Sequence, residues 1–124
     1  MALYVGFDSS TQGLSALVID VERDRRAIAW SGTINFDRDL PAYGTHHGIL
    51  DSDDPLIAVA PPALWAEALD LVMARLSREV DVSRVSAIAG SAQQHGSVYL
   101  RQGADARLRA LDPATPLVDL TCAP

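Results

Sequence analysis

The chain has 124 residues, a formal net charge of −6 and an apolar fraction of 48%, which fit one acidic domain of ordinary size. The acidic balance argues against nucleic acid as a partner, and no apolar run approaches the roughly 20 residues that cross a bilayer. A single cysteine, Cys122, cannot form an internal disulfide, and no basic segment precedes the first apolar run. We therefore expect a cytoplasmic α/β protein without a secretory signal.

The first third of the chain predicts three strands in an antiparallel meander. Apolar runs at residues 3–7 and 14–21 have strand character, and a hydroxyl-rich turn separates them. A charged turn leads to residues 27–36, whose small, β-branched and aromatic side chains predict the third strand. Strands joined by such short turns pair with their neighbours in antiparallel fashion.

Residues 37–60 form the least regular stretch, with two prolines, two glycines and several acidic residues. A structureless segment of this length inside a compact domain is uncommon and is often functional. His46 and His47 lie near the acidic segment 51–54 and could bind a metal with it. A solvated acidic loop is the interpretation that we favour.

The pair Pro61 and Pro62 predicts the start of a helix, because a proline in the first turn gives up an N–H that would be unpaired there. The helix should end near Val80. Its buried face is predicted by apolar residues at helical spacing: Trp65, Leu69, Val72 and Leu76. Residues 85–90 then form a near-continuous apolar run, which predicts a strand buried on both faces.

This order of elements predicts an α/β fold with a particular topology. A helix that crosses from an antiparallel meander to a parallel neighbour gives an incomplete ribonuclease-H-like lobe. Residues 98–101 predict one more short strand, and the pattern weakens from Gln102 onward.

Asp8 lies at the end of the first predicted strand and begins a polar turn. A carboxylate there can hold a metal ion through water, and Ser10, Thr11 and Gln12 can surround a phosphate oxygen with hydroxyls and free N–H groups. The alternative is a hairpin that Asp and Ser side chains simply cap.

A second polar segment, Gln-Gln-His-Gly at residues 93–96, follows the last predicted strand. The amides of Gln93 and Gln94 both donate and accept hydrogen bonds, which suits the recognition of hydroxyl groups. His95 is better suited to a substrate hydroxyl than to a metal, because no second ligand lies at helical or hairpin spacing. The alternative is a polar loop that satisfies its own hydrogen bonds.

Three segments in this order resemble the N-terminal part of the FGGY carbohydrate kinases, and among them the xylulokinases. Residues 7–12 are similar to the first phosphate motif, 36–41 to a stretch peculiar to xylulokinase-like members, and 93–99 to the sugar-contacting loop. The resemblance covers residues 3–119 as an incomplete first lobe and leaves 120–124 as a tail. Ser10 and Ala92 stand where glycine is usual in the family.

The resemblance implies an actin-like ATPase fold, ATP and Mg²⁺ as cofactors, and transfer of the γ-phosphoryl group to D-xylulose. Asp8 matches the magnesium-associated aspartate. The positions that match the phosphate-facing turn and the sugar-reading loop are Ser10, Thr11, Gln12, Gln94 and His95. The general base of the family lies beyond residue 124, so we expect this piece to be inactive alone, to need the remainder of the kinase chain, and to self-associate through exposed apolar surface.

Three alternatives stay open at this stage. Another FGGY kinase would act on a different ketose, a polyol or glycerol, and residues 36–41 are the feature against it. A non-catalytic module or remnant would fold without turning over ATP. A chaperone-like or actin-like ATPase should lack the Gln-Gln-His segment.

Overall fold

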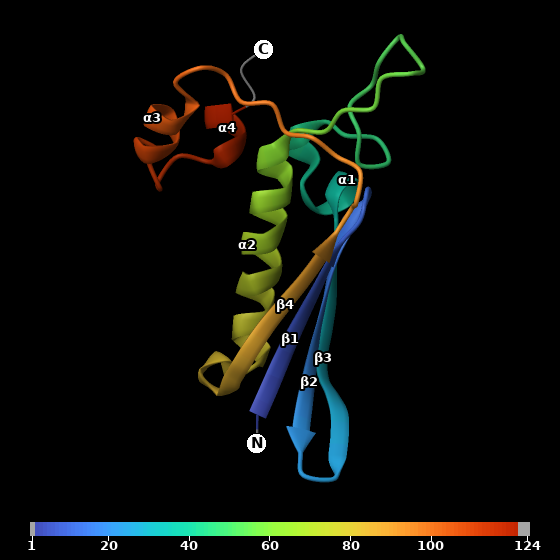
Figure 1. Ribbon diagram of the computed structural model, residues 1–124, viewed down its shortest axis with the longest axis vertical. Helices are drawn as coiled ribbons and strands as arrows, with labels where there is room; N and C mark the ends of the chain where they lie inside the picture. Colours follow the sequence, from blue (N-terminus) through green and yellow to red (C-terminus); the bar gives the residue numbers. More distant parts are fainter. Residues whose placement is uncertain (1, 122–124) are drawn as a thin grey trace.

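The computed structural model describes residues 2–121 and consists of a four-stranded sheet with a long helix packed on one face (Figure 1). The strands, in the sheet order β3-β2-β1-β4, are β3 (Arg25–Asn35), β2 (Gly13–Glu22), β1 (Ala2–Ser9) and β4 (Val85–Ala92). The first three pair antiparallel, and β4 pairs parallel to β1. The predicted α/β class, meander and parallel fourth strand are confirmed, while Cys122 and the last residues of the tail lie outside the described part of the chain.

Helix α2 (Pro62–Glu79) begins directly after Pro61 and ends where the N–H of Val80 bonds to Leu76, as predicted. Its buried stripe differs from the predicted one by one position along part of its length. The side chains that pack into the core are Leu64, Ala68, Val72 and Leu76, together with Ala63. Trp65 is half-buried and Leu69 is 43% exposed, because two apolar stripes obey the helical period and only packing on the sheet selects between them.

The prediction that the last strand is buried on both faces is wrong. Helix α2 packs mainly over β2 and β3, and it reaches β1 where Leu76 meets Leu3 and Val5. Strand β4 pairs with β1 alone and is the edge of the described sheet, so that Ile88 is 59% exposed. An apolar run shows what a strand could bury, but not whether another element covers it.

Part of the stretch predicted to be irregular is anchored in the core. A short helix, α1 (Phe36–Asp39), follows β3 directly, and a 3-10 helix (Pro41–Tyr43) comes next. Phe36, Leu40 and Tyr43 are buried in the same cluster as the stripe of α2. The third strand therefore ends one residue earlier than predicted, because Phe36 turns into the core as the first residue of a helix.

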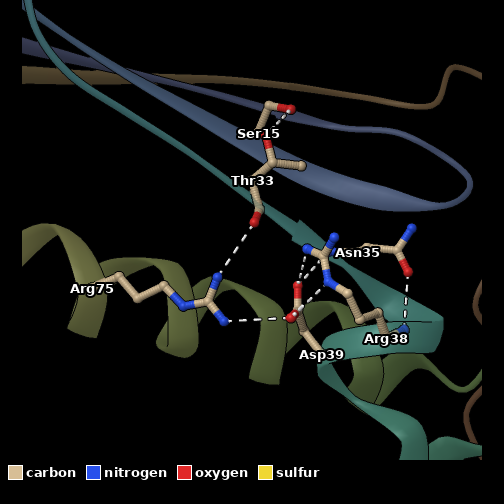
Figure 2. A network of polar contacts seen from close by, with 6 residues as sticks. All are labelled: Ser15, Thr33, Asn35, Arg38, Asp39 and Arg75. Carbon is tan, nitrogen blue, oxygen red and sulfur yellow. Dashed lines mark hydrogen bonds and ion pairs between the residues drawn. The ribbon is translucent and has the colours of Figure 1, made fainter.

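A polar network joins the end of β3 to α1 and α2 (Figure 2). The side chain of Asn35 accepts the N–H of Arg38 at 2.9 Å, and Asp39 accepts the N–H of Asn35 at 2.8 Å, so each end of the turn caps the other. Arg75 of α2 adds an ion pair of 3.5 Å with Asp39 and donates to the carbonyl of Thr33. The hydrogen bond from the Arg38 guanidinium, aided by the N–H of Asn35, lowers the pKa of Asp39 to about 2.

The C-terminal part contains two short helices, α3 (Ala104–Arg109) and α4 (Leu117–Thr121), and α4 contacts α2. Residues 98–101 carry no strand, contrary to prediction, because this segment finds no partner strand in the described sheet. Among residues 2–121, no helix has the length and apolar character that a membrane span requires.

Replacing Asp39 by asparagine should destabilise the fold by roughly 1–2 kcal/mol near neutral pH, because the charge-assisted bonds to Arg38 and Asn35 are weakened. The folded-state pKa of about 2 lies below that of an unfolded aspartate. The stabilisation is therefore complete above about pH 4 and is lost as the pH falls toward 2.

Urea unfolding of wild type and Asp39→Asn, each at about pH 7 and about pH 2.5, measures this difference. The matched control is Asp70→Asn, which changes an exposed carboxylate of α2 that bonds to no residue in the described range. A stability difference of the same size at both pH values would contradict the assignment.

The uncovered sheet surface should make the chain self-associate. Tyr4 and Ile28 are exposed on the face away from α2, and β4 offers a free edge next to Ile88. Sedimentation velocity at increasing concentration should show association that Ile88→Lys reduces, whereas Leu56→Lys, which removes an exposed apolar residue from a loop, should not. A wild-type chain that stays monomeric at high concentration would refute this expectation.

Candidate functional site

Parallel pairing of β1 with β4 brings the two polar segments of the sequence together. In the register of these strands Asp8 lies opposite Ser91, 83 positions later in the chain. The Ser91 hydroxyl donates a hydrogen bond of 2.9 Å to the Asp8 carboxylate. Just beyond the strand ends, the Gln93 amide donates to the Thr11 hydroxyl at 2.6 Å. Both contacts lie at the end of the sheet near α1 (Figure 1).

Asp8 belongs to a row of polar side chains that crosses all four strands. Ser91, Asp8, Ser15 and Thr33 are successive partners in the register, so their side chains point to the same face, away from α2. The hydroxyls of Ser15 and Thr33 lie 3.3 Å apart (Figure 2). Three of the four residues line a shallow hollow of about 650 Å³. The exposed Asp8 carboxylate therefore has room for a hydrated ligand and hydroxyl groups on either side.

The turn between β1 and β2 is held rigidly and keeps two donors free. The N–H and the hydroxyl of Ser10 both donate to the carbonyl of Gly13, at 2.8 and 3.2 Å. The carbonyl of Gln12 accepts the N–H of Phe36 at 3.0 Å, which ties the turn to the start of α1. Within residues 2–121, the N–H groups of Thr11 and Gln12 donate to no acceptor. Two free N–H groups on a fixed, exposed turn suit an anionic oxygen such as that of a phosphate.

A second cavity, of about 250 Å³, lies beside this turn. Thr11, Gln93, His95 and Ser97 contribute polar side chains to its lining, and the half-buried Trp65 contributes an aromatic wall. Of the two residues predicted to read a sugar, His95 lines the cavity and Gln94 does not. Gln93 lines it instead, and its amide bonds to the Thr11 hydroxyl just beyond the end of β4 at Ala92.

The residues around Asp8 fit a hydrated cation better than a protein cage. No group of three or more His, Cys, Asp or Glu side chains that could hold a metal occurs in the described range. In the 37–60 stretch, the ring of His46 bonds instead to Asp51 at 2.9 Å. Mg²⁺ keeps several waters and needs only one or two protein carboxylates, so the exposed Asp8 is suited to bind a hydrated Mg²⁺ ion.

Comparison with known proteins finds xylulose kinases among the proteins that this chain resembles. Mouse xylulose kinase is 40% identical over 114 residues, which are 91% of this chain and 20% of the relative. Xylulose kinase 2 of Arabidopsis thaliana is 42% identical over 113 residues, again with 20% of its own length covered. Xylulose kinase of Schizosaccharomyces pombe is 37% identical over 115 residues. No protein-family model matches the chain.

Solved structures show a more distant likeness. Two structures of a Ppx/GppA enzyme from Aquifex aeolicus align with TM-scores of 0.42 and 0.44, at 10% and 11% identity. Each alignment covers 73% of this chain and 26% of the other. Likeness at this level does not define the fold, which rests on the strand order itself. The sequence comparison is the specific one: about nine-tenths of the chain is similar to xylulose kinases, and the chain spans about a fifth of their length.

Proposed function

We propose that this chain forms the phosphate edge and one side of the sugar pocket in an ATP-dependent sugar kinase, and that the sugar is D-xylulose. The observation that carries the proposal is the β1–β4 pairing, which sets Asp8 opposite Ser91 and brings the turn after Asp8 to the segment after β4, so that Thr11 and His95 line one cavity. The similarity to xylulose kinases over about nine-tenths of the chain supports the choice of sugar.

In this proposal, separate residues of the chain bind the metal, the phosphate and the sugar. Bound ATP with Mg²⁺ supplies the γ-phosphoryl group and neutralises its charge. Asp8 would hold the hydrated metal, with Ser91 fixing its carboxylate. The N–H groups of Thr11 and Gln12 would donate to a phosphate oxygen, and His95 with Gln93 would pair hydroxyls of the sugar.

The remainder of such a kinase would come from outside this chain. The general base and the adenine pocket are expected there, so the chain alone should not turn over ATP. Phosphoryl transfer depends on positioning by several elements at once, and this chain offers one edge of the site. A kinase for another ketose or a polyol is the second candidate, and a panel of sugars offered to the full-length protein decides between them.

In the full-length protein, Asp8→Asn should lower kcat by at least about 10²-fold, because the variant keeps the side chain's size and loses the charge that supports the metal. Steady-state kinetics with saturating ATP and sugar measures the effect. Asp24→Asn is the matched control, since it changes an exposed aspartate in the β2–β3 turn at the opposite end of the sheet. An Asp8→Asn enzyme with near-normal kcat would remove Asp8 from this role.

Replacing His95 by alanine should raise KM for the sugar more than KM for ATP. A site built to pair a hydroxyl loses about 1–3 kcal/mol when one polar partner is missing, which corresponds to roughly 5- to 150-fold in KM. Gln93→Ala should have the same kind of effect and Gln94→Ala should not, because only Gln93 lines the cavity. Equal changes in the two KM values, or a larger effect of Gln94→Ala, would argue against this arrangement.

A further inference from the structure

The stretch after α1 contains a tight hairpin made by residues 45–49, which we call the 45–49 hairpin. His46 and Ile49 pair as an antiparallel bridge, with N–H to carbonyl distances of 2.8 and 3.2 Å. The two residues between them, His47 and Gly48, have φ angles of 54° and 81°. Two successive left-handed residues define a type I′ turn, and a histidine in that conformation is unfavourable unless its surroundings hold it.

A single carboxylate holds this hairpin. One oxygen of Asp37 accepts the Thr45 hydroxyl at 2.8 Å and the N–H of Gly48 at 3.1 Å, and the other accepts the N–H of His47 at 2.6 Å. These bonds, with that from Thr45 foremost, lower the pKa of Asp37, so it is ionised near neutral pH. The two N–H groups of the turn that lie outside the bridge are therefore both paired with one anion.

Asp37 can act as a clamp because its own position is fixed. It lies on α1, whose first residue, Phe36, is fully buried in the core. Asn35 caps the helix, and Asp39 is tied to Arg38 and to Arg75 of α2 (Figure 2). The Asp37 carboxylate thus fixes the surface hairpin relative to the core.

The 45–49 hairpin lies against the turn between β1 and β2. A Cβ atom built on Gly48 would lie 1.8 Å from the carbonyl oxygen of Thr11, so only glycine allows this approach. Gly48 and Ile49 also line the cavity of about 250 Å³, next to Thr11 and His95. Asp37 itself is not among the lining residues. The hairpin therefore forms one wall of the cavity, and Asp37 supports this wall without lining the cavity itself.

We propose that Asp37 is a positioning residue: by holding the 45–49 hairpin against Thr11, it fixes the wall of the cavity and sets the affinity of that cavity for a small polyhydroxy ligand. This inference rests on the proposed function for the identity of the ligand. The hydrogen bonds to Thr45, His47 and Gly48 occupy both oxygens of Asp37, which leaves it a supporting rather than a ligand-binding role.

Kinetics of the full-length protein test the effect on the site. Asp37→Asn should raise KM for the sugar about tenfold and leave KM for ATP within about twofold, because the loosened wall belongs to the sugar side of the turn. Asp53→Asn is the matched control, an exposed carboxylate in the same stretch with no bond to another residue in the range 2–121. Equal effects of Asp37→Asn on both substrates, or no effect on either, would overturn the positioning role.

Two glycine substitutions test the close approach of the hairpin to Thr11 and leave Asp37 unchanged. Gly48→Ala should raise KM for the sugar at least as much as Asp37→Asn does, because the new methyl group forces the hairpin away from Thr11. Gly44→Ala is matched in backbone strain, with φ of 66°, but its methyl group meets no atom within 4 Å. Similar kinetics for the two alanine variants would mean that the close approach to Thr11 is unimportant, and would overturn the proposal.

Amide hydrogen exchange provides a readout that does not depend on kinase activity. In the 124-residue chain, Asp37→Asn should speed exchange of the His47 and Gly48 amides by about tenfold or more, while amides in the centre of β2 exchange as in wild type. Unchanged exchange at His47 and Gly48 would overturn the clamp. Faster exchange in a full-length protein that phosphorylates no sugar would uphold the clamp and refute the proposed function instead.

Discussion

The parallel pairing of β1 with β4 is the constraint on which the site depends. It sets Asp8 opposite Ser91. Beyond the strand ends, it brings the amide nitrogen of Gln93 to 2.6 Å from the hydroxyl oxygen of Thr11. Helix α2 makes this pairing possible, because it carries the chain back along the sheet so that β4 enters in the same direction as β1 (Figure 1). A shift of one residue in the register would turn Ser91 to the face covered by α2 and separate it from Asp8.

The other side of the site depends on close backbone contacts rather than on the sheet. The turn after β1 is tied to α1 through the carbonyl of Gln12, and Gly48 approaches Thr11 so closely that a side chain has no space. Both contacts originate in the segment that follows β3, whose aromatic residues Phe36 and Tyr43 are buried in the core. A surface cavity can therefore have a defined shape although one of its walls is a loop.

The two faces of the sheet differ in what they offer. The face under α2 holds the apolar core, in which Val18 and Ile34 of the sheet and Leu64 of the helix are fully buried. The open face combines an exposed apolar end around Tyr4 and Ile28 with the polar row that contains Asp8. Apolar area of this kind favours association with further protein, whereas a carboxylate flanked by hydroxyls favours water and ions. The proposed chemistry therefore belongs to the end of the sheet where β1 and β4 terminate.

The sequence by itself determined the four strands of the sheet, though it added a fifth at residues 98–101 that does not form, and it determined the span of α2 and the two polar segments. Apolar periodicity, proline position and polar turns are local signals. The sequence named His95 and Gln94 as the residues for the sugar, but Gln93 lines the cavity in place of Gln94, because that choice depends on where β4 ends. Only the tertiary structure decided which stripe of α2 is buried, that β4 is an exposed edge, and that Asp37 holds the hairpin against Thr11. These features are contacts between distant residues, and their energies depend on packing and register that no local pattern contains.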